Sequence, residues 1–375
     1  MKKFVLIPDS FKGTLSSKTI CEIMQSEIYK IFPNAEVAKI PVADGGEGSV
    51  DCFLSAMGGD IIKLKASGPF FDTVDGFYGL IDGGKTAIIE MSATAGLPLV
   101  ENNKDPLRTT TYGVGQLIKD ATYRGVKKII VGLGGSCTND FGCGTACACG
   151  VKFFDKNGKE FIPTGGTLSD VANIDLSGLD EKIKKVDIEV MCDIDNPPFG
   201  INGASAIFAP QKGADEKAVK LLDEGVKNIC KVVNKTLGLD LSNLKGGGAA
   251  GAMGAGMVAF FNAKIKMGID TVLNEVGFSE IIKDADVVFT GEGKIDGQSL
   301  RGKVVIGVAR KAKEQGVPVI AIVGGVDGDM SEAYEQGVTA VFSINRLPQD
   351  FSVSRFKSEQ NLRATFSDVL RALKI

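Results

Sequence analysis

The sequence predicts an α/β protein in which a doubly wound parallel-sheet domain, of the Rossmann or flavodoxin-like kind, is interrupted by an inserted second α/β domain. At both ends of the chain, short apolar segments lead into glycine-rich loops and then into helical segments, which is typical of strands in a parallel sheet. Between residues 61 and 99 the pattern changes to short alternating runs, which favour antiparallel strands. The length of 375 residues allows roughly two domains.

The two ends of the chain are expected to form one sheet. Strands are predicted at 3–8 and 37–42, each followed by a polar loop and a helix, and Ser16 is suited to cap the first helix. From about residue 285 the predicted order is again strand and helix, three times over. Each end alone is short for a doubly wound sheet. We therefore expect one domain from residues 1–67 and 285–375, an inserted domain from residues 68–284, and the active-site cleft between them.

The loop that follows the apolar residues 287–289 is the leading candidate for a phosphate site. Its segment from Gly297 to Lys303 matches the spacing G-x-x-x-x-G-K of a P-loop, but Val304 stands where a P-loop requires Ser or Thr for Mg²⁺. We reject a true P-loop fold and retain phosphate binding, because backbone N–H groups at a helix N-terminus attract phosphate together with a lysine. The alternative is an ordinary βα turn with solvated charges.

Composition narrows the chemistry that the chain can perform. It contains no histidine, which excludes Ser-His-Asp and Cys-His catalysis, so a general base must be Asp, Glu, Lys, Tyr or Cys. The net charge of −3 gives no indication of nucleic acid or an anionic membrane as a partner. The eight cysteines contain no C-x-x-C pair and are expected to pack as small apolar side chains. With no signal peptide and no apolar run of about 18 residues, the chain is expected to be cytoplasmic.

Two loops of the predicted insert combine glycines with polar side chains. In residues 108–115, Arg108 and several hydroxyls precede a helix, so this loop can either bind an anion or cap the helix. The strand at 128–131 leads into the sequence GLGGSCTND at 132–140. This second loop is of the phosphate-cradle type, because its glycines leave backbone N–H groups open to a ligand.

Acidic residues mark the end of another predicted strand, at 188–192. Asp193 and Asp195 follow it directly, and two acids at that place can hold Mg²⁺, which prefers oxygen ligands. Residues 246–251 match the dinucleotide pattern G-x-G-x-x-G, but no convincing strand precedes them. A nicotinamide site is therefore not expected.

Seven motifs follow one another along the chain: Asp9-Ser-Phe-Lys12-Gly13, Ala43-Asp44-Gly-Gly-Glu47-Gly48, Arg108-Thr-Thr-Thr-Tyr-Gly-Val-Gly, Gly134-Gly-Ser136-Cys-Thr138-Asn139-Asp140, Gly203-Ala-Ser205-Ala, Pro210-Gln-Lys212-Gly213 and Thr290-Gly-Glu292-Gly-Lys-Ile-Asp296 through Gly302-Lys303. In this order they resemble the bacterial type 1 glycerate kinase family over nearly the whole chain. Cys137 and Cys143 stand where that family usually has smaller residues, and Asp195 makes its acidic segment richer than usual. The resemblance implies a two-domain α/β enzyme that phosphorylates D-glycerate, usually on O2, with ATP and Mg²⁺.

With that resemblance we assign roles as hypotheses. Asp193 or Asp296 orients or deprotonates the attacking hydroxyl, and the other carboxylate helps to place Mg²⁺, with Asp195 as a second metal ligand. Cationic side chains neutralise phosphate oxygens and the substrate carboxylate; these are Lys12, Arg301 and Lys303. The remaining residues expected to bind substrate or phosphate are Asp44, Glu47, Arg108, Gly134, Gly135, Ser136, Asn139, Asp140, Glu292 and Ser299.

Two alternatives to this assignment stay open. The phosphoryl group can go to O3 of glycerate, giving 3-phosphoglycerate, or the protein can be a non-catalytic binder of small anions. A hydride-transfer enzyme requires a strand-anchored dinucleotide fingerprint, which the sequence lacks. The oligomeric state is not predicted.

Overall fold

The computed structural model describes residues 1–43, 45–297 and 299–374. Contacts between residues divide the chain into two compact units. Unit 1 consists of Met1–Asp44, Asp51–Met57 and Met267–Ile375, and unit 2 consists of Gly45–Val50 and Gly58–Lys266. The chain therefore passes between the units four times.

This division differs from the expected boundaries at two places. Residues 58–67 lie in unit 2, because β3 (Asp60–Ser67) pairs along its whole length with β4 (Thr73–Ile81). Residues 267–284 lie in unit 1, because α9 (Gly268–Glu275) packs against α11 (Val304–Lys313), where Ile269 lies against Gly307.

Unit 1 contains a five-stranded parallel sheet with the spatial order β14-β13-β12-β1-β2. In the order of the chain this arrangement is 2-1-3-4-5, the flavodoxin-like form of the doubly wound fold. The order reverses between β1 and β12, so ligands are expected beyond the carboxyl ends of these two strands. The strands are β1 (Lys3–Pro8), β2 (Glu36–Lys39), β12 (Val287–Gly291), β13 (Val319–Val323) and β14 (Val338–Ser343).

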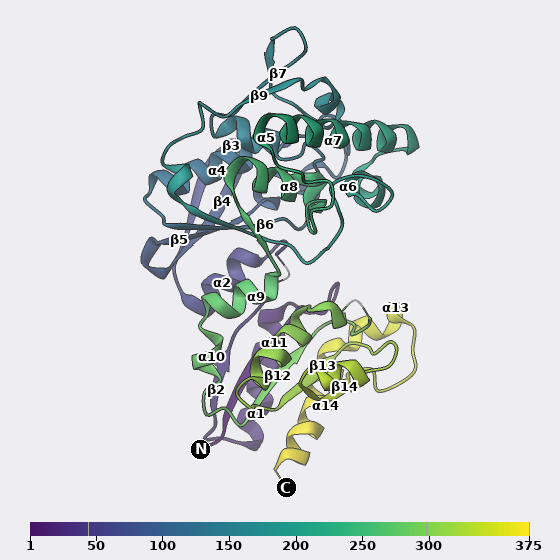
Figure 1. The fold of residues 1–375 in the computed structure, drawn as a ribbon. Coiled ribbons are helices and arrows are strands. Elements are labelled where there is room, and N and C mark those ends of the chain that lie inside the picture. The colour runs from purple at the N-terminus through teal and green to yellow at the C-terminus, as the bar shows by residue number, and fades with distance from the viewer. Residues whose placement is uncertain (44, 298, 375) are drawn as a thin grey trace. The chain divides into compact units, whose positions relative to one another are not determined.

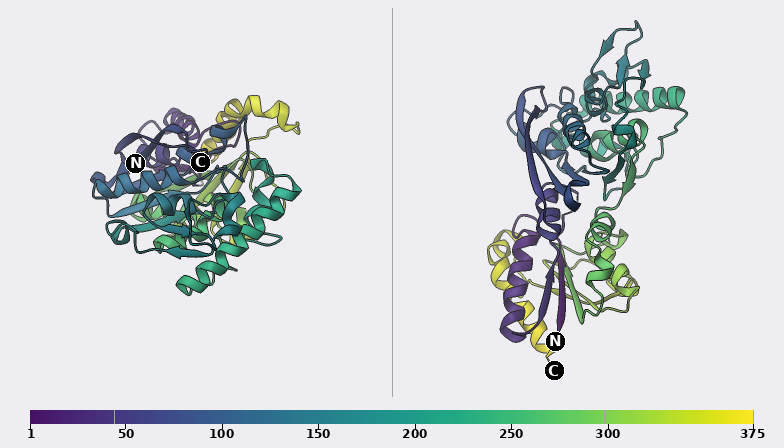
Figure 2. Two further views of the ribbon diagram at one scale, coloured as in Figure 1. Left: turned by 90° about the horizontal axis from the view of Figure 1, so that it is seen from above. Right: turned by 90° about the vertical axis from the view of Figure 1, so that its left-hand side faces the viewer.

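Helices cover both faces of this sheet, with α1 and α14 on one side and α9 and α11 on the other (Figures 1 and 2). Ser16 caps α1 as expected, since its side chain accepts a hydrogen bond from the Thr19 amide at 3.1 Å. On the α1 face the rings of Phe289 and Phe366 meet edge-on, 4.8 Å apart. The helices of unit 1 besides α9 and α11 are α1 (Ser17–Ile31), α10 (Phe278–Ile281), α12 (Ser331–Glu335), α13 (Phe351–Ser354) and α14 (Ser358–Leu373); α2 (Ser49–Met57) contains one of the passages between the units.

Unit 2 contains a six-stranded mixed sheet with the order β11-β10-β6-β5-β4-β3. The antiparallel segment predicted between 61 and 99 is confirmed for β3 and β4. Its last strand, β5, pairs antiparallel with β4 on one side and parallel with β6 on the other. The carboxyl ends of three strands therefore meet at one edge, where Glu90 lies beside Gly132 and Gly132 beside Met191. These strands are β5 (Thr86–Glu90), β6 (Lys128–Gly132) and β10 (Asp187–Met191), with β11 (Lys264–Lys266) beside β10.

The helices of unit 2 pack around a core rich in small side chains, which includes Cys143, Cys149 and Cys230. All eight cysteines are free thiols and six of them are buried, as expected for packing residues. The helices are α3 (Ser92–Ala95), α4 (Tyr112–Tyr123), α5 (Cys143–Ala148), α6 (Ala204–Phe208), α7 (Glu216–Leu237) and α8 (Ala249–Phe261), and a small separate sheet holds β7 (Lys152–Phe154), β8 (Glu160–Phe161) and β9 (Asn173–Asp175). Within the described residues, no helix is both long and apolar enough to cross a membrane.

Candidate functional site

Two carboxylates meet at the point in unit 1 where the strand order reverses. Asp9 directly follows β1 and Glu292 directly follows β12, and the Asp9 amide donates a hydrogen bond of 2.7 Å to the Gly291 carbonyl. Both acidic residues are buried. This is the place at which doubly wound sheets bind ligands. Asp9 was not among the predicted site residues, although its position directly after the first strand was a usable signal.

Glu292 is the most perturbed carboxyl group of this region. The residue is only 6% exposed, and among the described residues none donates a hydrogen bond to its Oε1 atom. Burial, together with the negative charges of Asp9 and Asp296, raises the pKa of Glu292 to about 7, against the opposing effects of a Ser299 hydrogen bond and the Lys303 charge. At neutral pH this carboxyl group therefore exchanges a proton readily, as a general acid or base must.

The loop after Glu292 is held by its own turn and by the neighbouring strand end. The Asp296 amide and Ser299 Oγ are 3.3 Å apart, and the Ser299 amide donates to Asp296 Oδ1 at the same distance. The Ile295 amide donates to the Gly325 carbonyl at 3.0 Å, which ties the loop to the segment after β13. The turn ends in a 3₁₀ helix, Ser299–Arg301, and then in α11.

The predicted cations of unit 1 differ in their surroundings. Lys303 is half-buried, stands at the N-cap of α11, and its charge acts on Glu292. Lys12 is exposed, and its backbone amide lies close to Gly293, where an added Cβ atom would be 3.3 Å from it. Lys294, to which no role was assigned, pairs with Asp327 at 2.6 Å. The side chain of Arg301 lies outside the described part of the structure.

In unit 2, the strand-end edge is lined by closely packed backbone. The Gly134 amide donates to the Gly45 carbonyl at 3.0 Å. A Cβ atom on Gly134 would lie 2.4 Å from Gly46 Cα, and one on Gly132 would lie 2.4 Å from the Gly45 oxygen. Only glycine fits at these contacts. The predicted glycine loop therefore packs directly against the Gly45–Val50 segment.

A buried lysine, which was not predicted as a site residue, donates hydrogen bonds to the Gly134–Asp140 loop. Lys212 is 2% exposed, and its Nζ atom donates to Ser136 Oγ at 2.7 Å and to the Thr138 carbonyl at 2.6 Å. Burial lowers the pKa of Lys212 to about 8. Its burial has no signal in the sequence, because a lysine that follows proline and glutamine reads as an exposed turn residue.

The two last residues of this loop have different surroundings. The Asn139 side chain donates to Ser205 Oγ at 3.2 Å, and its Oδ1 atom and Thr138 Oγ1 are buried with no hydrogen-bond partner among the residues that the structure describes. Asp140 is fully buried and accepts from the amide and hydroxyl of Thr111, at 2.7 and 2.9 Å, and from the amides of Gly142 and Gly144, at 3.1 and 3.3 Å. Burial raises the pKa of Asp140 against these hydrogen bonds. The contacts of Asp140 thus fix the loop to α4 and α5.

A second buried acid that the sequence analysis missed supports the same edge. Glu90, the last residue of β5, accepts a hydrogen bond from the Val50 amide at 2.7 Å and lies 3.3 Å from Ser92 Oγ. It is 2% exposed. It therefore holds the first turn of α2, as a carboxylate near a helix N-terminus does.

The other predicted residues of this region lie nearer the surface. Asp193 is half-buried and follows β10, Asp195 and Glu47 are exposed, and Asp44 lies outside the described residues. Arg108 is exposed and lies over the ring of Phe70 at 5.6 Å. Among the described residues, no group of three or more acidic or cysteine side chains is close enough to hold a metal ion by itself.

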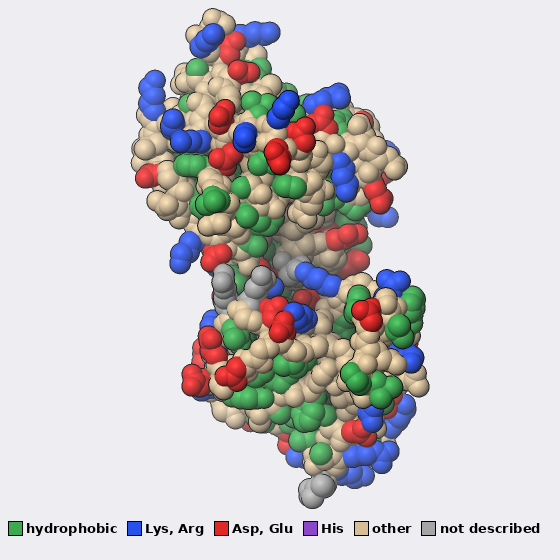
Figure 3. Space-filling model, turned by 90° about the vertical axis from the view of Figure 1, so that its right-hand side faces the viewer, with side chains coloured by type: hydrophobic (Ala, Val, Ile, Leu, Met, Phe, Trp, Pro, Cys, Tyr) green, Lys and Arg blue, Asp and Glu red, His purple; other side chains and the backbone are tan. Residues whose placement is uncertain are grey.

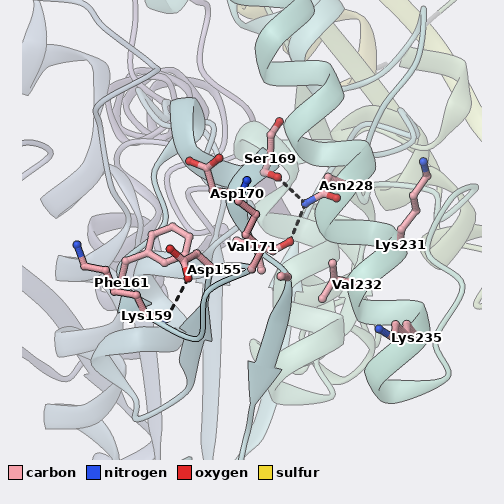
Figure 4. A pocket seen from close by; sticks show the side chains of 12 residues that line it. Asp155, Lys159, Phe161, Ser169, Asp170, Val171, Asn228, Lys231, Val232 and Lys235 are labelled. Carbon is pink, nitrogen blue, oxygen red and sulfur yellow. Dashed lines mark hydrogen bonds between the residues drawn. The ribbon is translucent and has the colours of Figure 1, made fainter.

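Unit 2 also contains a hollow of about 830 Å³ away from these loops, between α7, the end of the 3₁₀ helix Gly165–Asp170 and the β7–β8 turn (Figure 4). Four lysines border it, Lys156, Lys159, Lys231 and Lys235, but Asp155 and Asp170 lie there as well. None of the predicted site residues lines it. Elsewhere on the surface, acidic and basic side chains intermingle over the face that Figure 3 shows.

The fold and these loops define a class: an α/β protein with buried carboxyl and ammonium groups at the carboxyl ends of its parallel strands. The chain belongs to the glycerate kinase family, whose model matches residues 4–374, and it is a kinase of that family. The resemblance stated from the motifs is thereby confirmed.

Named relatives match over almost their whole length. The chain is 43% identical to a glycerate kinase of Bacillus cereus, covering 100% of this chain and 98% of that protein. It is 44% identical to the glycerate 2-kinase of Escherichia coli, covering 91% and 90%. A crystal structure from Salmonella typhimurium LT2, described as a candidate glycerate kinase 2, superposes with a TM-score of 0.87 at 39% identity and covers 100% of this chain and 98% of that one.

Proposed function

We propose that this protein transfers the γ-phosphoryl group of ATP to O2 of D-glycerate, giving 2-phospho-D-glycerate. The observation that carries the proposal is the near-full-length relationship to a protein named glycerate 2-kinase. The cytoplasm, where ATP is available, is the proposed place of action. Phosphoryl transfer depends mainly on positioning and on stabilising charge, and a chain without histidine can supply both.

Glu292 is the proposed general base of this reaction. It lies where a doubly wound sheet binds ligands, one of its oxygens has no partner within the described part of the chain, and its pKa of about 7 suits proton transfer at neutral pH. Asp296 shares a turn with Ser299, which in turn bonds Glu292. In this proposal Asp296 therefore orients the base, and Lys303 balances the negative charge at the start of α11.

Asp193 and Asp195 are the proposed protein ligands of Mg²⁺. Mg²⁺ in kinases is held by one or two carboxylates together with substrate phosphates and water, so a pair of acids after a strand fits this ion without a third carboxylate beside it. When bound with ATP, the ion would neutralise part of the phosphate charge. The Gly134–Asn139 loop is the proposed anion cradle. The amides of Gly134 and Cys137 donate to the carbonyls of Gly45 and Ala95, at 3.0 and 2.9 Å, and hold the loop in place, and the amides of Gly135 and Ser136 are the proposed donors to the anion.

The test is phosphorus NMR of the products formed from D-glycerate, ATP and the purified protein, with and without Mg²⁺. The expected product signal is a phosphomonoester split by one adjacent proton, which identifies the 2-phosphate, and it should require Mg²⁺. Splitting by two protons would identify the 3-phosphate and refute the position assigned here. Intact ATP and no new signal would refute glycerate as the acceptor.

A further inference from the structure

Lys212 is a buried cation, and no described carboxylate forms an ion pair with it. Its two hydrogen bonds go to a hydroxyl and a carbonyl. The nearest acidic influence is Asp140, whose oxygens already receive four protein donors. A buried ammonium group without a counter-ion costs free energy, so its retention calls for an explanation.

The direction of the hydrogen bond between Lys212 and Ser136 explains why a lysine is buried here. A lysine ammonium group can only donate, so Ser136 Oγ must accept from Lys212. The hydroxyl hydrogen of Ser136 is then left to donate elsewhere, and no described residue accepts it. Because Ser136 is held in a glycine loop at the carboxyl end of β6, this hydrogen is available to a bound ligand.

We propose that Lys212 is a positioning residue that orients the Ser136 hydroxyl as a donor to an oxyanion, and that the ligand supplies the counter-charge which Lys212 lacks. This inference rests on the proposed function and extends it to the recognition of an anionic group. The group is a carboxylate or a phosphate, since both accept hydrogen bonds and carry negative charge. The lysine acts through Ser136 and does not itself contact the ligand.

The arrangement makes anion binding dependent on pH. Lys212 faces Ser136, the Cys137 thiol and the Asp140 carboxylate, and these last two are the titratable groups whose charges act on it. With a pKa lowered from 10.5 to about 8, Lys212 is charged below pH 8 and loses its charge above it. A bound anion favours the charged form and therefore raises this pKa. Anion affinity should accordingly be highest below pH 8 and fall as the pH rises.

Three variants test the proposal: Lys212→Met, Ser136→Ala and the double variant. Calorimetric titration with D-glycerate, and separately with ATP, reports which anion is affected. We expect Lys212→Met to weaken one of these ligands by roughly ten-fold or more, about 1.4 kcal/mol, with a smaller change in kcat than in KM. Lys220→Met is the matched control, since Lys220 is exposed on α7, and it should bind both ligands as the unmodified protein does.

The double variant separates orientation from mere packing. If Lys212 acts through Ser136, adding Lys212→Met to Ser136→Ala should weaken binding clearly less than Lys212→Met weakens it in the unmodified protein, because only the attraction between the two charges remains to be lost. Independent, additive losses would overturn the proposal. The unmodified protein provides a test that does not depend on the folding of a variant: its affinity for the anion must fall above pH 8, and a constant affinity from pH 7 to 9.5 would refute the inference.

Failure of the proposed function would be distinguishable from failure of this inference. If D-glycerate gave no phosphorylated product, titration with ATP and with inorganic phosphate would still report whether Lys212 supports anion binding. Equal affinities of the unmodified protein and Lys212→Met for all three anions would refute the role of Lys212, whether or not the protein turned over glycerate.

Discussion

Replacing Glu292 by glutamine should make the protein less active and, at alkaline pH, more stable. The substitution keeps the shape of the side chain and removes its ability to take a proton. General acid–base catalysis contributes roughly 10²–10⁴-fold to a rate, so we expect kcat to fall within that range. In the unmodified protein kcat/KM should rise with pH through about 7, as Glu292 loses its proton, and should fall again above pH 8 if Lys212 supports anion binding as proposed.

The stability of Glu292→Gln follows from the same pKa. In the unfolded chain this carboxyl group ionises near 4.5, and in the folded protein near 7. Between these values the folded state binds more protons, so stability falls as the pH rises through this window. A difference of that size corresponds to about 3 kcal/mol. The glutamine side chain does not ionise, so the free energy of unfolding of the variant should exceed that of the unmodified protein by up to about 3 kcal/mol at pH 8 and by little at pH 4.5.

Two assays measure these effects. Steady-state kinetics from pH 5.5 to 9 gives the activity profile, and native-state hydrogen exchange of the β1 and β12 amides reports the stability of unit 1 separately from that of unit 2. Activity of the variant within a few-fold of the unmodified protein would refute Glu292 as the base. Equal stabilities of the two proteins at pH 8 would refute the raised pKa from which both expectations come.

Three further substitutions test other parts of the site. Asp296→Asn should lower kcat by roughly ten- to a hundred-fold and leave the urea midpoint nearly unchanged, because it weakens the orientation of the base without removing it; unaltered kcat would contradict its role. Gly134→Ala should lower the free energy of unfolding by about 1–3 kcal/mol, measured in urea, because its Cβ atom would stand 2.4 Å from Gly46 Cα. An unchanged urea midpoint would show that the loop moves to accept the Cβ atom and would contradict tight packing at this glycine. Asp140→Ala should lower the free energy of unfolding by about 3 kcal/mol or more, since it leaves four buried hydrogen-bond donors without an acceptor. A smaller loss of stability together with lost activity would indicate that Asp140 binds the ligand instead.

The sequence identified the strand-end loops because their signals are local. An apolar run followed by glycines and charges marks the carboxyl end of a buried strand, and this pattern correctly located the loops after β1, β6, β10 and β12. The local capping signal of Ser16 was also confirmed, since its side chain accepts from the Thr19 amide at 3.1 Å at the start of α1.

Features that depend on distant contacts could not be read in the same way. One such feature is the pairing of β5 with both β4 and β6, because it depends on how strands far apart in sequence are arranged. The burial of Lys212 and Glu90, and the four donors around Asp140, arise from packing between segments tens of residues apart. No spacing rule distinguishes such a buried polar residue from an ordinary surface one.

The interleaving of the two units along the chain has a consequence for synthesis. Unit 2 can form once residue 266 has left the ribosome, whereas the central strand β1 of unit 1 receives its neighbour β12 only after residue 291. At roughly 5–20 residues per second of translation, the edge of β1 that later pairs with β12 stays unpaired for on the order of tens of seconds. The nascent N-terminus is therefore the part of this protein most in need of a chaperone, and the part that no truncated clone of unit 1 can reproduce without joining distant segments.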